Sequence, residues 1–149
     1  MPVIRIETFI RAPAEACFDR ARDVEAHVAS ASRTKERAIA GVTTGLLGLG
    51  DEVTWEAVHF GVRQRLTSRI TRFDRPRMFV DEMVRGAFAS FEHVHEFVPS
   101  EGGTTMIDTF TYRAPLGPLG RVADVLFLER HMRRFLVERA NALREALEA

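Results

Sequence analysis

His93 and His95 stand one residue apart, and their imidazoles are the side chains in this sequence best suited to acid–base chemistry near neutral pH. In an extended strand, residues two apart point to the same face, so both rings lie on one side of a sheet. A turn at residues 102–103 would pair this strand with the next and set Asp108 opposite His95. A histidine beside a carboxylate can act as a general base, and Tyr112 on the same face can donate to an enolate oxygen. His95, Asp108 and Tyr112 are therefore the candidate catalytic residues, and the alternative is a structural hydrogen bond between His95 and Asp108 in a packed core.

The same two histidines also fit half of a zinc site. Imidazoles at positions i and i+2 can share one Zn²⁺, and His59 could supply a third ligand. The expected sheet order separates His59 from the pair by several strands, which argues against closure of the site. The cupin barrels carry a similar pair, but Gly86 and Glu101 do not stand at the cupin spacing. We therefore predict no metal site and no cofactor.

A glycine-spaced stretch at residues 45–50 invites comparison with a phosphate-binding loop. Such a loop needs a Gly-Lys-Ser/Thr ending, or a preceding hydrophobic strand and a following helix. Here the glycines lead into Asp51 and a strand. The stretch predicts a turn or loop and no nucleotide site.

Composition and charge argue against several classes of protein. The 149 residues carry 21 basic and 21 acidic side chains, so the formal net charge is zero and nothing favours a nucleic-acid partner. No stretch reaches the ~18 apolar residues of a membrane span, and the first residues lack the apolar run of a signal peptide. Cys17 is the only cysteine, which excludes an internal disulfide and fits a reducing compartment. We expect one cytoplasmic domain over residues 1–149 with no integral membrane segment.

Strands must position the histidines and Asp108, and alternating apolar and polar residues predict six or seven of them. A short helix with Cys17 at an apolar position should follow the first strand, and a second short stretch after a kink should reach Val28. Short connections favour antiparallel pairing of neighbouring strands. The candidate strands, of which the second is weaker, span 3–11, 33–43, 53–60, 62–73, 78–84, 88–98 and 104–113.

The stretch from Pro118 to Glu148 predicts one long amphipathic helix, because neither glycine nor proline interrupts it after Gly120. Its apolar face needs an apolar surface, and a curved antiparallel sheet that grips the helix supplies one. The predicted fold class is therefore α+β. Glu129 and Arg133 fall inside the apolar sector, where they either pair with each other at its edge or face a cavity between helix and sheet.

The period-two alternation also assigns one face of the last five strands to the interior. If Gly61 lies in a tight turn, His59 pairs near Val62, and Trp55 pairs near Leu66. The resulting inner face is mostly apolar. Its polar members are His59, Gln64, Ser68, Asp81, His93, His95, Asp108 and Tyr112. So many polar groups are hard to satisfy in a dry core, so a partly hydrated cavity with apolar walls competes with a packed interior.

Several motifs follow one another along the chain in step with these elements. They cover residues 10–18, 50–55, 79–86, 91–97, 103–108 and 112–117. Together with the order of strands and helices, they resemble a small bacterial ligand-binding member of the SRPBCC superfamily over essentially the whole chain. That superfamily contains START lipid-transfer domains, birch-pollen-allergen-like proteins and polyketide cyclase/dehydrase-like proteins. The resemblance implies a helix-grip fold, in which the sheet and the C-terminal helix enclose a hydrophobic cavity for a lipid-like or polycyclic ligand, and it implies no fixed catalytic motif.

Three functions follow as hypotheses. The first is binding, for transport or sequestration, of a small hydrophobic ligand with one polar end. The second is a cyclase- or dehydrase-like enzyme that uses His95 and Asp108. The third is a protein-interaction module, which predicts an exposed apolar patch, and a homodimer through an edge strand or the helix is compatible with the sequence. The candidate ligand-binding residues are Trp55, His59, Gln64, Leu66, Phe79, Asp81, Met83, Phe91, His93, His95, Phe97, Met106, Asp108, Phe110, Tyr112, Leu126, Glu129, Met132 and Arg133.

Overall fold

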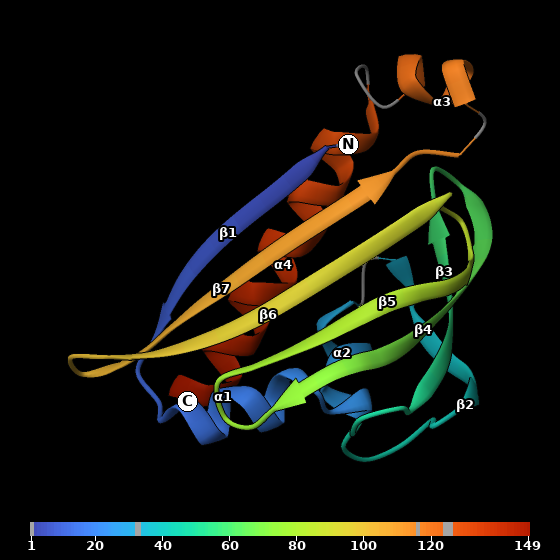
Figure 1. The fold of residues 1–149 in the computed structure, drawn as a ribbon. Coiled ribbons are helices and arrows are strands. Elements are labelled where there is room, and N and C mark those ends of the chain that lie inside the picture. Colours follow the sequence, from blue (N-terminus) through green and yellow to red (C-terminus); the bar gives the residue numbers. More distant parts are fainter. Residues whose placement is uncertain (1, 32–33, 116, 124–126) are drawn as a thin grey trace.

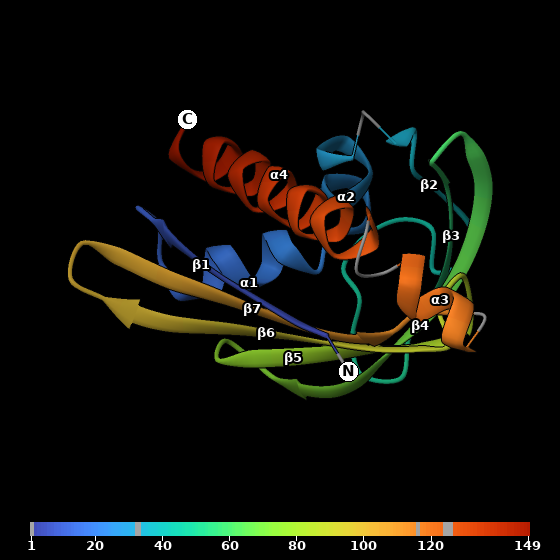
Figure 2. The same ribbon diagram turned by 90° about the horizontal axis from the view of Figure 1, so that it is seen from above.

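A curved antiparallel sheet of seven strands forms one layer of the protein, and helices cover its concave face (Figures 1 and 2). The computed structural model describes residues 2–31, 34–115, 117–123 and 127–149. The strand order across the sheet is β1-β7-β6-β5-β4-β3-β2, so every neighbour except the β1–β7 pair is also consecutive in the chain. The α+β helix-grip fold predicted from the sequence is confirmed.

All seven predicted strands are present, with shifted ends. They are β1 (Val3–Ile10), β2 (Arg37–Gly41), β3 (Glu52–His59), β4 (Val62–Asp74), β5 (Met78–Gly86), β6 (Ser90–Ser100) and β7 (Gly103–Arg113). The two short helices predicted after the first strand are α1 (Ala14–Ala21) and α2 (Val24–Ser30). Asp23 caps α2, because its side chain accepts hydrogen bonds from the backbone of Glu25 and Ala26.

The prediction of one unbroken helix from Pro118 is wrong. The structure contains α3 (Gly117–Ala123) and the long helix α4 (Glu129–Glu148), and residues 124–126 lie outside the described part of the chain. Helix α4 packs on β1 and on the helices α1 and α2. On α3, Leu119 and Val122 are 68% and 58% exposed, so the apolar pattern there does not mark a buried face. Figures 1 and 2 show α3 set apart from the axis of α4.

The predicted strand register is confirmed at its anchor pairs. Trp55 pairs with Leu66, and His95 pairs with Asp108. The β4–β5 ladder contains two irregularities, one of them between Ile70 and Arg72. This β-bulge shifts the alternation of β4 by one residue, so Phe73 also turns toward the interior.

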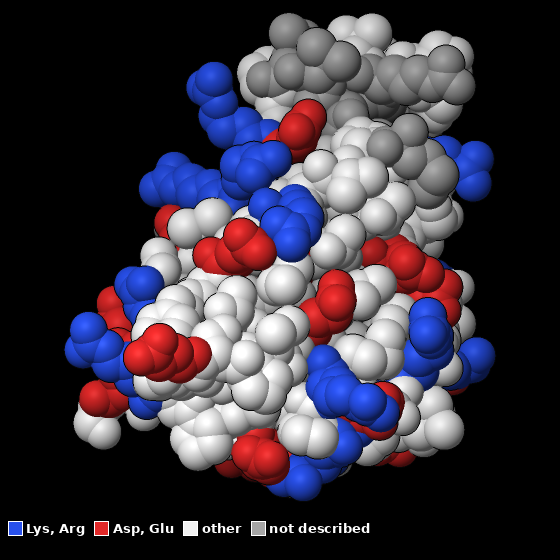
Figure 3. All heavy atoms as spheres, turned by 60° about the vertical axis from the view of Figure 1, so that its left-hand side comes forward, with Lys and Arg blue, Asp and Glu red and all other residues white. Residues whose placement is uncertain are grey.

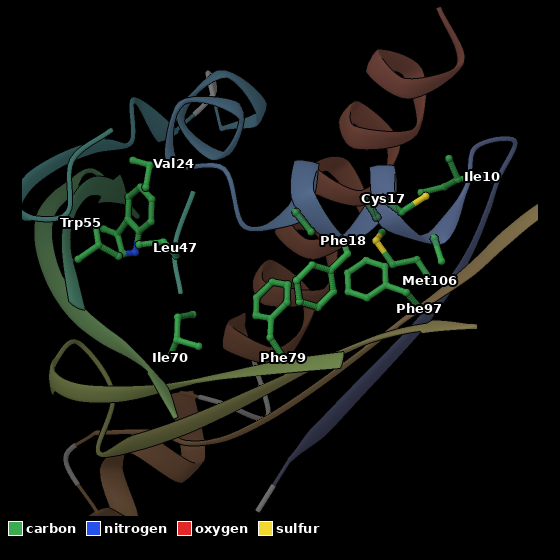
Figure 4. Packing of buried hydrophobic residues seen from close by; sticks show 14 residues of the cluster. Ile10, Cys17, Phe18, Val24, Leu47, Trp55, Ile70, Phe79, Phe97 and Met106 are labelled. Carbon is green, nitrogen blue, oxygen red and sulfur yellow. The ribbon is translucent and has the colours of Figure 1, made fainter. Parts of the chain in front are cut away.

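A packed aromatic core occupies the end of the sheet that α1 covers (Figure 4). The ring of Phe18 on α1 meets the rings of Phe73, Phe79 and Phe97 at centroid distances of 5.3, 5.2 and 5.4 Å. Cys17 is fully buried beside it, as predicted. Because α1 fills this end with side chains, any cavity under α4 must lie toward the opposite end.

The convex face of the sheet carries the charged side chains. Glu56 on β3, for example, accepts hydrogen bonds from Arg37 Nε at 3.1 Å and Arg65 Nε at 3.2 Å on the strands to either side. Such mixed charges are those of a solvated sheet face. Basic and acidic groups are also interspersed on the side of the molecule displayed in Figure 3.

Candidate functional site

A cavity of about 650 Å³ lies between the concave face of the sheet and α4. Its size is in the range typical of small-molecule sites. Strands β3 to β7 form its floor, and helix α4 forms its roof, with α2 at one end and α3 at the other. Most of its walls are apolar. Its charged carboxylates lie near the α2 end, and His59 and His131 lie toward the opposite end. The described residues that line it are His27, Glu36, Trp55, Ala57, His59, Phe60, Gln64, Arg65, Leu66, Ser68, Asp81, Ala87, Phe88, Phe91, His93, Phe110, Ala114, Pro115, Leu119, Val122, Phe127, Leu128, His131, Met132, Phe135, Leu136 and Arg139.

The structure brings about half of the predicted ligand-binding residues together around this cavity. The ones that line it are Trp55, His59, Gln64, Leu66, Asp81, Phe91, His93, Phe110 and Met132. Each projects from the concave face of the sheet or the buried face of α4, as the periodicity indicated. These residues surround the part of the interior that α1 does not reach.

Other predicted residues face the interior without lining the cavity. They are Phe79, Met83, His95, Phe97, Met106, Asp108 and Tyr112. Phe79, Phe97 and Met106 belong to the packed core around α1. Tyr112 is fully buried and lies against the ring of Phe88, with centroids 5.6 Å apart. The alternation identified the inner face correctly, and it could not tell which part of that face another element fills.

Glu129 and Arg133 lie outside the cavity. Their side chains are both 49% exposed, and Arg133 Nη2 is 3.9 Å from Glu129 Oε1. Of the two arrangements expected from the sequence, the structure therefore has the one in which Glu129 and Arg133 pair with each other at the edge of the apolar face. The remaining predicted residue, Leu126, lies outside the described part of the chain.

Two carboxylates and two imidazoles form a buried network at the cavity floor. His93 Nε2 is 2.9 Å from Asp108 Oδ1, and His95 Nε2 is 3.0 Å from Asp81 Oδ1. His95 Nδ1 also lies 3.3 Å from Asp108 Oδ1, so the predicted contact between those residues exists. Within this network His93 and Asp81 line the cavity, whereas His95 and Asp108 lie behind them.

The two histidines have different protonation. Both ring nitrogens of His95 face carboxylates, which only accept hydrogen bonds, so this ring donates from both and is an imidazolium. Burial opposes that charge, but the hydrogen bonds to Asp108 and Asp81 outweigh burial and raise the pKa of His95. Burial and the neighbouring His95 lower the pKa of His93. His93 is therefore neutral, with Nε2 donating to Asp108 and a lone pair on Nδ1.

The network also holds its carboxylates in the ionised form. Burial alone would raise the pKa of Asp81, but the hydrogen bond from His95 prevails and lowers that pKa to about 2. Hydrogen bonds from His93 and His95 likewise overcome burial at Asp108 and hold its pKa well below the ordinary value. Each buried charge is thus paired, as a stable interior requires.

The geometry of the histidines does not suit a metal ion. Asp81, His93 and His95 each offer one ligand atom, and these atoms lie within 4.8 Å of one another. The two rings, however, are stacked with centroids 3.7 Å apart and planes at 23°. Lone pairs in two nearly parallel, stacked rings run side by side and do not converge on one ion. The absence of a metal stays a prediction, supported by this arrangement.

The α2 end of the cavity is lined by residues that were not among the candidates predicted from the sequence. His27 Nε2 on α2 is in direct contact with Glu36 Oε1, and the His27 ring stacks on Trp55 at a centroid distance of 4.0 Å. Arg139 reaches the same end from α4, and it and His27 also line a smaller pocket of about 170 Å³. Arg139 follows Met132 by seven residues, a spacing that returns to the same face of a helix, so the sequence contained a signal for it.

The opposite end of the cavity carries exposed apolar side chains. Phe60, Leu119, Val122 and Phe127 line the cavity and are each more than half exposed. Beside Phe60, the hydrogen bond between His59 Nδ1 and His131 Nε2, at 2.8 Å, ties the end of β3 to α4. Side chains that both face the cavity and contact solvent define its mouth.

Comparison with known proteins identifies the family to which this chain belongs. The family model described as polyketide cyclase/dehydrase and lipid transport matches residues 1–148. The chain belongs to this family. Membership confirms the SRPBCC resemblance of the sequence motifs, and the match extends over the sheet and all the helices. A sequence comparison with curated proteins found no significant match.

Several solved structures share the fold over nine-tenths or more of their length. TTHA0849 from Thermus thermophilus has a TM-score of 0.81 at 22% identity, covering 98% of this chain and 97% of that one. Ms6760 from Mycobacterium smegmatis has a TM-score of 0.72 at 18% identity, covering 97% and 90%. Ginseng major latex-like protein 151 from Panax ginseng has a TM-score of 0.67 at 12% identity, covering 99% and 98%. At these identities the likeness shows the fold alone.

Within the described part of the chain, no helix combines the length and the apolar character that crossing a membrane needs.

Proposed function

We propose that this member of the polyketide cyclase/dehydrase and lipid-transport family binds a small, mainly hydrophobic molecule in the cavity beneath α4. The observation that carries the proposal is the distribution of polarity along the cavity. Aromatic and aliphatic side chains make up most of the lining, and a cluster of titratable side chains, His27, Glu36, Asp81, His93 and Arg139, lies at the inner end. Toward the mouth, His59 and His131 are hydrogen-bonded to each other. Such a cavity suits a ligand with an apolar body and one polar end.

The exposed apolar residues at the mouth fit the same role. Leu119, Val122 and Phe127 stand where a ligand would enter from solution. An apolar patch is also what an interaction module would present. Because these side chains continue into the cavity wall, we assign them to ligand entry.

Filling the cavity with a side chain provides the test. Ala57 lines the cavity and is 6% exposed, so Ala57→Phe places a ring in the ligand space. Val58→Phe adds the same ring one residue along, on the opposite face of β3, and is the matched control. N-phenylnaphthylamine, an uncharged probe that fluoresces in apolar surroundings, should bind the wild type and Val58→Phe and lose at least about tenfold affinity for Ala57→Phe. Equal binding to all three folded proteins would rule out this cavity as the binding site.

A second candidate function is proton abstraction next to a carbonyl group, and one observation favours it. The neutral imidazole of His93 lines the cavity with Nε2 held by Asp108, and its Nδ1 lone pair, 4.0 Å from Asp81 Oδ1, can serve as a base. The sequence reasoning assigned the base to His95, but His95 lies behind His93 and donates from both nitrogens. His93 is therefore the better candidate.

Deuterium exchange separates an enzyme from a binder. β-Tetralone in D₂O exchanges the hydrogens next to its carbonyl, and NMR follows the rate. If the protein is an enzyme of this type, it accelerates the exchange, and His93→Gln removes most of the acceleration, about a hundredfold or more for a lost general base. An exchange rate equal to that in buffer leaves binding alone as the function.

A further inference from the structure

Arg139 is the innermost residue on the cavity face of α4. That face consists of His131, Met132, Phe135, Leu136 and Arg139, and Leu128 continues it just before the helix begins. Arg139 follows Leu128 by eleven positions, which is ~16 Å along the helix axis. A ligand bound along α4 therefore has its apolar body beside leucine, methionine and phenylalanine, and its polar end beside a guanidinium.

The charges around Arg139 restrict what that polar end can be. Glu36, Asp81 and Asp108 place three carboxylates at the inner end, against the Arg139 guanidinium and the His95 imidazolium. Glu36 is engaged by His27, and Asp81 by His95. Arg139 makes no ion pair within 4.0 Å with these carboxylates or with any other residue that the structure describes. Its positive charge still lowers the pKa of both Glu36 and Asp81, so it acts on them across a gap.

This arrangement penalises a charged ligand of either sign. A carboxylate or phosphate would come close to Glu36 and Asp81, and like charges repel strongly where water is scarce. An ammonium group would face the guanidinium of Arg139. An uncharged oxygen avoids both penalties, because a carbonyl or hydroxyl can accept a hydrogen bond from Arg139.

We infer that the cavity selects an uncharged amphipathic ligand, and that Arg139 determines this specificity by donating to a carbonyl or hydroxyl oxygen of the ligand. The inference rests on the proposed binding function and adds the chemical class of the ligand. It also assigns a role to a residue outside the network of histidines and aspartates. Arg65, the other arginine of the cavity lining, donates from Nε to Glu56 on the convex face and does not compete for this role.

Three ligands with the same chain and different head groups test the inference. Decanol, decanoate and decylammonium are compared at pH 7.4 by displacement of N-phenylnaphthylamine. Decanol should displace the probe at a concentration at least about tenfold below that of either charged ligand, because each charged head group meets a like charge.

Arg139→Met then tests the residue. Loss of the donor should weaken decanol about tenfold, while decylammonium should bind more tightly, because the repelling cation is gone and the carboxylates remain. A merely loosened structure would weaken both. Arg134→Met removes an exposed arginine that bonds Glu138 and should change neither affinity. Arg139→Lys, which keeps the charge, should keep decylammonium weak and serves as a second variant if Arg139→Met does not fold.

These experiments distinguish a failure of the proposed selectivity for uncharged ligands from a failure of the proposed binding function. If the probe does not bind the wild type, the proposed function and the inference both fail. If the probe binds and decanoate displaces it as well as decanol does, the cavity binds ligands but the inference is wrong. Unchanged affinities in Arg139→Met would overturn the role of Arg139.

Discussion

His93, and not its neighbour His95, is the histidine that both lines the cavity and donates to Asp108, across 2.9 Å between Nε2 and Oδ1. The Cα register pairs Asp108 with His95, so the shorter hydrogen bond runs diagonally across the two strands. The diagonal bond leaves His95 free to bridge Asp108 and Asp81. Two histidines on one strand face therefore take different protonation states.

The first prediction concerns the order in which these histidines titrate. Nitrogen NMR of the imidazoles should show His93 titrating below 6.5 and His95 above it, the directions in which their pKa values are shifted. The raised pKa of His95 stabilises the fold below the unfolded value, and this contribution is lost as pH rises through the folded pKa. The lowered pKa of His93 has the opposite effect. The reverse order of titration would contradict the assigned hydrogen bonds.

Acid should destabilise the protein through Asp81. Its pKa is about 2 in the fold against an ordinary 3.8, so its contribution is present above pH 3.8 and is lost as pH falls toward 2. Asp81→Asn should cost about 2 kcal/mol at pH 7 and flatten the fall in stability between pH 4 and pH 2. Urea unfolding at several pH values measures this. Asp74→Asn, at a side chain that is 51% exposed, is the control and should cost about 0.5 kcal/mol or less at pH 7.

The contact between Glu36 and His27 should contribute to the stability of the fold. Burial lowers the pKa of His27, so its contact with Glu36 joins a neutral ring to a carboxylate. Replacing Glu36 by Gln removes the charged acceptor in a buried site and should cost about 1–3 kcal/mol. Glu25→Gln makes the same change at an exposed position of α2 and should cost less than about 0.5 kcal/mol. The fluorescence of Trp55, on which His27 stacks, reports the unfolding of both variants. Equal stability of the two would show that the contact of His27 with Glu36 contributes nothing.

The core around α1 and the cavity should respond separately to mutation. Phe18→Ala removes a fully buried ring that touches three others and should destabilise the protein by about 3–5 kcal/mol. Phe9→Ala, at a ring that is 43% exposed, should cost about 1 kcal/mol or less. Probe affinity should stay within about twofold in the Phe18 variant wherever it is still folded, because neither Phe18 nor the three rings that it touches line the cavity. A large loss of affinity there would mean that the ligand reaches into the core.

The sequence was sufficient for the fold because alternation and turn spacing act locally. The pairing of Trp55 with Leu66 and of His95 with Asp108 followed from hairpin geometry alone. The division of the inner face into core and cavity depends on where α1 packs. The alternation within each strand gives no information on the position of α1. Met106 and Phe97 follow the same strand alternation as Phe110 and Phe91, yet Phe18 packs at their end of the sheet.

The residues at the inner end of the cavity could not be predicted from the sequence for a similar reason. Its residues come from α2, from the segment before β2 and from the last third of the helix predicted to begin at Pro118. Only the fold brings His27, Glu36 and Arg139 together, across more than a hundred residues of sequence. The helical spacing of Arg139 was visible, but the surface it would face was not.

Methionine methyl NMR tests the central claim most directly. The chain contains five methionines, of which Met132 lines the cavity and Met106 lies in the packed core. With the methyl groups labelled, decanol should shift the Met132 signal in a saturable way and leave the Met106 signal in place. A shift of Met106 without Met132, or saturating decanol with no shift of either, would contradict a ligand site between the sheet and α4.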